Sequence, residues 1–240
     1  MPKHLVFVGG GHAHRTALAG LRDTVRAGHR VTVIGPSPYH YYSGMGPGLL
    51  SGIYRPAEAR FHVKMMAQDG GATFIEDRVV LVDPVRRALV LGSGAEVRYD
   101  AVSFNTGSEV PSDLLHPSGE DGGLLVNEYL QCIGPPELFG GGDCVSLAGS
   151  PLARVGVFAV RQNRPLHRNL SAFLEGRPLQ RFDPGGDYLL ILNLGDRMGL
   201  FRRKGIVRSG RLAFQLKNYL DTRFMGKFQV SGELREPLEE

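Results

Sequence analysis

The residues best suited to chemistry stand near the N-terminus, where glycines follow a short apolar run. Residues 5–8 predict a buried strand, and Gly9-Gly10-Gly11 comes directly after it. Gly9 permits a tight turn, and Gly11 lets the backbone approach a diphosphate at the start of a helix, where free N–H groups favour negative charge. His14 stands where such a fingerprint has its third glycine. The context favours a dinucleotide site, and an ordinary strand-to-helix turn is the alternative.

The elements around these glycines predict a βαβ unit. Gly28 ends an expected helix, and residues 30–34 form a second strand. Parallel strands joined in this way need a right-handed crossover. The acid that would bind a ribose after the second strand is absent, because Gly35 follows Ile34, and this weakens the case for NAD in the loop. The apolar face of the expected helix repeats every four residues, at Ala17, Leu21 and Val25.

Composition limits the class of protein. The 240 residues include 33 glycines, against about 17 in an average chain, which indicates tight turns and close approach of the backbone to a ligand. A net charge of +4 with scattered basic residues does not suggest a nucleic-acid partner. Two cysteines are too few for a disulfide scaffold, and neither a signal peptide nor a bilayer-spanning apolar run is seen. A cytoplasmic protein, at most peripheral to the inner face of a membrane, is therefore expected.

The remaining chain alternates strands and helices and predicts an α/β protein. Pro56 is expected to start a short helix ending near Gly70, and the segment 111–123, rich in Pro, Ser and Gly, is the best candidate for a junction. We expect one domain over 1–175 and a small α+β appendage over 176–240. Further strands are expected at 73–75, 79–82, 88–91, 96–99, 101–104, 124–126 and 188–193, and helices at 157–174, interrupted only by Pro165, and at 211–225.

Several longer motifs resemble the FAD-dependent pyridine nucleotide-disulfide oxidoreductase superfamily, and its type II NADH dehydrogenase and sulfide:quinone reductase branch in particular. They occur in the family's order and cover most of the chain. The motifs are VGGGHAH at 8–14, YYSGMGPG at 41–48, FNTGS at 104–108, LFGGGDC at 138–144, FAVRQNRPLHRNL at 158–170 and GRLAFQLKNYLDTRFM at 210–225. The resemblance implies a Rossmann-like, three-layer FAD-binding domain with a small C-terminal α+β appendage.

The resemblance also implies roles for individual residues. Those along the FAD diphosphate would be Gly9, Gly11, His12, Ala13 and His14, with Thr106 and Gly107, which match the family's Ala-Thr-Gly strand end, close by. Those at the flavin ring would be Ser43, Gly44 and Met45, together with Arg161 and Gln162 at the pyrimidine edge, where reduction builds negative charge. The backbone of Val79 would meet the adenine, and Gly142-Asp143 would meet the ribitol or diphosphate end.

Relatives carry a second nucleotide-binding domain, which binds NADH, between the Ala-Thr-Gly strand and the Gly-Asp motif. Here only residues 111–123 occupy that place, and no second glycine fingerprint follows. The favoured function is an FAD-containing oxidoreductase core that passes electrons to a small acceptor such as a quinone. The alternatives are an FAD-binding module or partner-dependent electron carrier without turnover of its own, and a protein that holds NAD or another nucleotide in the glycine loop. Electron donor, catalytic residues and any homodimer are left open.

Ordinary readings compete with several of these roles. Asp143 after glycines could cap a turn. His12 and His14 sit in a loop of positive dipole that disfavours a metal ion, so no metal site is expected. Cys132 and Cys144 are redox-active only if their surroundings favour the thiolate.

Two features of the C-terminal region are equally open. Lys204 is read as a solvated basic turn, with a quinone-side pocket as the alternative. The helix at 211–225 is expected to place Leu212, Leu216, Leu220 and Phe224 on one stripe and Arg211, Lys217 and Arg223 off it. Such a stripe serves core or interface packing or, alternatively, contact with a membrane surface.

Overall fold

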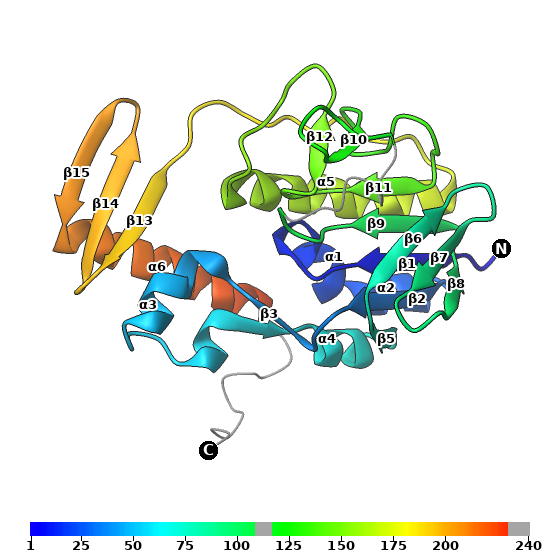
Figure 1. Ribbon diagram of the computed structural model, residues 1–240, viewed down its shortest axis with the longest axis horizontal. Coiled ribbons are helices and arrows are strands. Elements are labelled where there is room, and N and C mark those ends of the chain that lie inside the picture. Colours follow the sequence, from blue (N-terminus) through cyan, green and yellow to red (C-terminus); the bar gives the residue numbers. More distant parts are fainter. Residues whose placement is uncertain (109–116, 230–240) are drawn as a thin grey trace. The chain divides into compact units, whose positions relative to one another are not determined.

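The computed structural model describes residues 1–108 and 117–229 (Figure 1). The chain divides into two compact units, each built from two separate stretches. The first comprises 1–38 and 63–184, and the second comprises 39–62 and 185–240. The expected boundary near residue 175 is thus replaced by a division in which a segment from the N-terminal half, 39–62, joins the C-terminal unit.

A five-stranded parallel sheet forms the centre of the first unit. The strand order is β11-β9-β1-β2-β5, and every neighbouring pair is parallel. All five residues of β1 are buried, which explains why this apolar run carries no alternation. The expected α/β class with a Rossmann-type βαβ start is confirmed. The strands are β1 (His4–Val8), β2 (Arg30–Gly35), β5 (Thr73–Glu76), β9 (Ala101–Phe104) and β11 (Leu138–Gly140).

Helices join these strands, and the first crossover differs from expectation. The single helix expected to carry Ala17, Leu21 and Val25 is broken at Gly20, whose backbone leaves the helical region at φ −103° and ψ 14°. By contrast, α5 continues through Pro165 without interruption, because buried residues on both sides of the proline anchor it. The helices of the first unit are η1 (His12–His14), α1 (Arg15–Ala19), α2 (Leu21–Arg26), α4 (Val63–Asp69) and α5 (Gly156–Glu175).

Smaller sheets complete the first unit. The strands expected at 88–91 and 96–99 pair with each other as β7 and β8 of the antiparallel sheet β6-β7-β8, and β10 pairs with β12 in parallel. Of the junction expected at 111–123, residues 111–116 lie outside the described part of the chain, and β10 begins directly after it. The strands are β6 (Val79–Asp83), β7 (Ala88–Leu91), β8 (Glu96–Arg98), β10 (Leu124–Val126) and β12 (Val145–Leu147).

The second unit combines a three-stranded antiparallel sheet with helix α6 and the segment 39–62. The short helix expected from Pro56 to Gly70 is instead a 3-10 turn, a strand and helix α4, which belongs to the first unit. Segment 39–62 joins α6 through an aromatic cluster in which Phe224 meets Tyr42 and Phe61. The elements are β3 (Tyr39–Tyr41), η2 (Ser43–Met45), α3 (Gly46–Leu50), η3 (Pro56–Ala59), β4 (Arg60–His62), β13 (Leu190–Gly195), β14 (Met198–Arg203), β15 (Ile206–Gly210) and α6 (Arg211–Phe228).

Helix α6 buries a different face from the one that its sequence suggests. Leu212, Leu216 and Leu220 of the expected stripe are exposed, at 81%, 39% and 40%. Lys217, expected on the polar side, is 8% exposed. The buried face instead consists of Phe214, Lys217, Asp221, Met225 and Phe228. The leucine stripe is therefore a surface feature of this chain.

Candidate functional site

Two glycine turns and the turn that begins with Asn105 meet at the carboxyl ends of the parallel strands, where ligands bind in folds of this type. Gly9 follows β1, Gly142 follows β11, and Asn105 follows β9. The backbone N–H of Gly9 donates to the carbonyl of Ile34 at 2.8 Å, and that of Asn105 donates to Val8 at 2.9 Å. The sheet thus fixes the positions of residues that lie more than one hundred positions apart in the sequence.

Gly9 has no room for a side chain. Its φ of +84° lies in the left-handed region, and a Cβ atom there would stand 2.3 Å from the carbonyl oxygen of Asn105. A Cβ on Gly11 would likewise stand 2.4 Å from Oδ1 of Asn105. Both positions of the sequence fingerprint therefore require glycine, because Asn105 at the end of β9 lies too close for a side chain.

Asn105 occupies the space between these turns. The residue is only 4% exposed, and Oδ1 would lie 2.6 Å from a Cβ on Gly142. The Nδ2 group is buried and donates to no residue in the described part of the chain. A buried donor without an acceptor costs free energy, so a ligand with acceptor oxygens would fit beside it. The diphosphate of a dinucleotide has such oxygens.

His14, which replaces the third glycine, is a structural cross-link. Its Nδ1 lies 2.8 Å from the carbonyl of Gly9, and its Nε2 lies 2.8 Å from Oγ of Ser103 on β9. Burial lowers the pKa of His14 to about 3, and burial with the nearby Arg15 charge also lowers the pKa of His12 to about 3. Both imidazoles are therefore neutral near pH 7, and His14 ties the glycine turn to the strand without adding charge.

Arg15 supplies a charge that sequence reasoning missed. Its side chain is fully buried, and Nε donates to the carbonyl of Gly11 at 3.3 Å. A guanidinium keeps its charge in proteins, so it makes the glycine turn more favourable for an anion. The signal in the sequence was a basic residue directly after the His-Ala-His segment.

The predicted residues of the Gly-Asp motif and α5 also lie at this end of the sheet. Gln162 is buried, and its Oε1 accepts a hydrogen bond from the N–H of Gly142 at 2.6 Å. Burial raises the pKa of the half-buried Asp143. Nη1 of Arg161 donates to the carbonyl of Pro184. Gln162 therefore positions the glycine turn, while the predicted contacts of Arg161 and Asp143 with the flavin or ribitol stay predictions.

The other predicted contacts fall in different places. Thr106 and Gly107 are exposed at the end of β9, and Val79 is buried at the start of β6. Ala13 is buried in η1. Ser43, Gly44 and Met45 form η2 of the second unit, so their approach to a flavin ring also stays a prediction.

Neither cysteine has surroundings that favour a thiolate. Cys132 and Cys144 are both buried. Burial raises the pKa of Cys132 to about 11 and raises that of Cys144 as well. Both thiols are therefore protonated near pH 7, which favours the inert interpretation.

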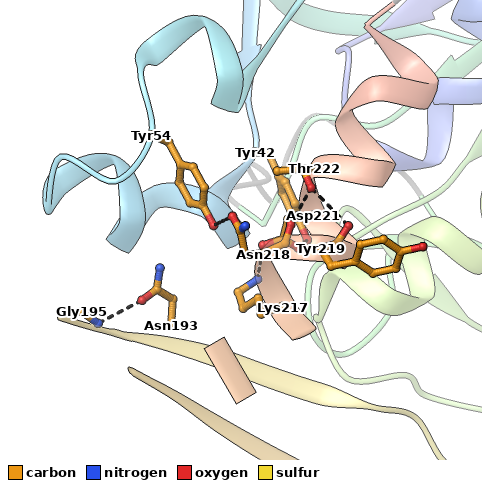
Figure 2. A network of polar contacts seen from close by, with 9 residues as sticks. All are labelled: Tyr42, Tyr54, Asn193, Gly195, Lys217, Asn218, Tyr219, Asp221 and Thr222. Atoms are coloured by element: carbon orange, nitrogen blue, oxygen red, sulfur yellow. Dashed lines mark hydrogen bonds and ion pairs between the residues drawn. The ribbon is translucent and has the colours of Figure 1, made fainter. Parts of the chain in front are cut away.

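A buried polar network ties α6 to segment 39–62 inside the second unit (Figure 2). Nζ of Lys217 lies 2.6 Å from Oδ2 of Asp221, and the hydroxyl of Tyr42 donates to Oδ1 of Asp221 at 3.1 Å. The hydroxyl of Tyr54 donates to Oδ1 of Asn218 at 2.8 Å. Burial raises the pKa of Asp221 and, with the nearby carboxylate, that of Tyr42. The network therefore holds the turn that contains the predicted flavin-contacting residues.

Comparison with solved structures decides the fold. Sulfide:quinone oxidoreductase from Aquifex aeolicus superimposes with a TM-score of 0.75 and 12% identity, over 98% of this chain and 93% of that one. NDH2 from Plasmodium falciparum gives a TM-score of 0.73 and 8% identity, over 98% and 99%. This chain has the fold of the FAD-dependent oxidoreductases. The fold that the motif resemblance implied is thereby confirmed.

A curated protein is also similar to this chain in sequence. The mitochondrial sulfide:quinone oxidoreductase of Dictyostelium discoideum is 26% identical over 132 residues. That match spans 53% of this chain and 29% of the curated relative. No protein-family model matches the chain.

Three further observations concern metal ions, membrane spans and Lys204. The described residues contain no cluster of three or more His, Cys, Asp or Glu that could hold a metal ion. None of the helices within 1–108 and 117–229 combines the length and apolar character needed to cross a bilayer.

Lys204 is exposed in the β14–β15 turn, and its backbone N–H donates to Oδ2 of Asp187 at 2.9 Å.

Proposed function

We propose that this chain is an FAD-containing oxidoreductase core that passes electrons between the flavin and a small acceptor such as a quinone. The observation that carries the proposal is the set of glycine turns around Asn105, at the carboxyl ends of β1, β9 and β11. The likeness to a sulfide:quinone oxidoreductase and to NDH2 supports the choice of acceptor class. When bound, FAD would supply the electron-transfer chemistry, and the protein would supply binding, orientation and electrostatics.

Different residues of the first unit would contribute to cofactor binding in different ways. Gly9 and Gly11 let the backbone approach the diphosphate, and the buried Arg15 adds positive charge beneath the same turn. His14 and Gln162 hold the turns at Gly9 and Gly142 in place through hydrogen bonds. A rigid turn of this kind loses little conformational entropy when it binds its ligand.

We further propose that the chain lacks the NADH-binding domain of its relatives, because only 111–123 stands in its place. Bound FAD should then be reduced slowly or not at all by NADH but fully by dithionite. Correct positioning of nicotinamide against a flavin can supply about 7–11 kcal/mol of barrier reduction, and that source is missing. Anaerobic loss of flavin absorbance measures both rates. Rapid, saturable reduction at micromolar NADH would contradict the prediction.

The same preparation separates an enzyme from an FAD-binding module. Reduced protein should transfer electrons to a soluble quinone faster than to oxygen if the acceptor proposal is correct. Equal, slow reoxidation by both would favour a module or a partner-dependent electron carrier without turnover of its own.

Peripheral contact with a membrane surface is proposed for the second unit. The exposed leucines of α6 recur every four residues, and exposed basic residues stand on the same helix. We expect co-sedimentation with vesicles that contain anionic lipid, and its loss when Leu212 and Leu216 are both replaced by serine. Equal recovery of both proteins in the supernatant would contradict membrane contact. The basic residues are Arg211, Arg223 and Lys227.

A further inference from the structure

Asn105 lies where the turns after β1, β9 and β11 converge, and its side chain fills the space between them. A Cβ atom on Gly11 or Gly142 would collide with the side chain of Asn105, and one on Gly9 would collide with its backbone carbonyl. The three glycines come from two loops more than 130 positions apart in the sequence. Their shared feature is that all of them make room for this asparagine.

The carboxamide of Asn105 is incompletely satisfied. Only 4% of the residue's surface is exposed, and its Nδ2 group meets no acceptor among the described residues. Buried amide donors are almost always paired, because an unpaired donor has lost its bonds to water without replacement. The fold therefore maintains a donor whose acceptor comes from outside the chain.

The chemistry around this donor selects the kind of acceptor. The buried Arg15 guanidinium is bonded to the carbonyl of Gly11 and makes the turn favourable for negative charge. Both nearby histidines are neutral near pH 7, so Arg15 supplies the positive charge at this turn. An anionic oxygen is the acceptor that such surroundings favour, and a hydrogen bond to a charged group is stronger than one between neutral groups.

We propose that Nδ2 of Asn105 donates a hydrogen bond to the diphosphate of the bound dinucleotide. This assignment rests on the proposed FAD-binding function. Asn105 stands where the family's Ala-Thr-Gly motif has alanine, so the side-chain donor is a feature of this chain beyond the backbone contacts that the motif implies. Asn105 thereby makes the site selective for ligands with a diphosphate.

Two substitutions separate a binding role from a packing role. Asn105→Ala removes the donor and leaves space, whereas Asn105→Asp keeps the shape and replaces the donor with an acceptor that repels phosphate. We expect the FAD dissociation constant to rise about ten-fold for alanine and about one hundred-fold for aspartate. A role in packing alone predicts the reverse order, because aspartate nearly matches asparagine in volume. Asn127→Ala is the control, since Asn127 caps a remote turn through bonds to Tyr129 and Gln131.

The affinities are measured on the full chain freed of cofactor, by titration with FAD, and repeated with ADP and AMP as probes that lack the flavin. The wild-type preference for ADP over AMP should fall about ten-fold in Asn105→Ala, because only ADP offers the diphosphate. If the wild-type protein binds FAD and both Asn105 variants bind it with the same affinity, or if the variants lose equal affinity for ADP and AMP, the proposed role of Asn105 is wrong. The proposed FAD-binding function is not affected by that outcome. Failure of the wild-type protein to bind FAD overturns this proposal together with the proposed function.

Discussion

Replacing Gly9 with alanine is expected to weaken FAD binding by at least about one hundred-fold, which corresponds to roughly 3 kcal/mol. The new Cβ would lie 2.3 Å from the carbonyl oxygen of Asn105 and 2.8 Å from its carbonyl carbon, both backbone atoms that cannot rotate away. The end of β9 must then move away from β1, and the turn that would hold the diphosphate opens. Titration of the cofactor-free protein with FAD measures the effect.

Gly28→Ala is the matched control for Gly9→Ala. Gly28 has a nearly equal φ of +90°, but a Cβ atom there would meet nothing within 4 Å. Both variants therefore carry the left-handed backbone strain of about 1–2 kcal/mol, and only Gly9→Ala adds a collision. Equal FAD affinities in the two variants would show that the glycine turn does not form the cofactor site.

Asp221→Ala is expected to lower the free energy of unfolding of the second unit by about 3–5 kcal/mol. The substitution leaves the ammonium group of Lys217 buried without its carboxylate, since the side chains of the pair are only 10% and 7% exposed. It also removes the acceptor of the Tyr42 hydroxyl. Because the chain contains no tryptophan, circular dichroism during chemical denaturation is a suitable measurement.

Two further variants test whether the buried charge is the cause. Arg223→Ala on the same helix removes an exposed bond to the hydroxyl of Tyr219 and should cost less than about 1 kcal/mol. Lys217→Met combined with Asp221→Leu removes both charges and should recover much of the lost stability. A double variant as unstable as Asp221→Ala would mean that packing around the pair, rather than the unpaired ammonium, determines the loss.

The sequence predicts four of the five strands of the central sheet, because they are short and largely apolar runs, but it does not predict β11. The residues of β1, β2, β5 and β9 are found where the pattern placed them, with differences of one residue at their ends. Helix continuity was harder to predict. Gly20 breaks the first crossover helix and Pro165 fails to break α5, because tertiary packing decides whether a weak position is tolerated.

The site was only partly predictable for a similar reason. Gly9 and Gly11 carry a known spacing after a strand, so local sequence identifies them. Local sequence does not identify Asn105, because its proposed role depends on two glycine loops that the sheet brings close to it from distant parts of the chain.

The burial of Lys217 on α6 is also not predictable from local sequence. Its burial follows from a partner at Asp221 and an aromatic neighbour at Tyr42, which is 175 positions earlier, whereas the helical period alone places it on a polar face. The leucine stripe that the period identifies is correct as a pattern, but it lies on the surface.

The absorption spectrum of the purified protein, with the mass of the cofactor released from it, tests the central claim most directly. We expect a flavin spectrum and the mass of FAD, because the glycine turns, the buried Arg15 and the unpaired donor of Asn105 together suit a dinucleotide diphosphate. A colourless protein that also fails to take up added FAD would contradict FAD binding, and the glycine turns would then be a scaffold without a cofactor.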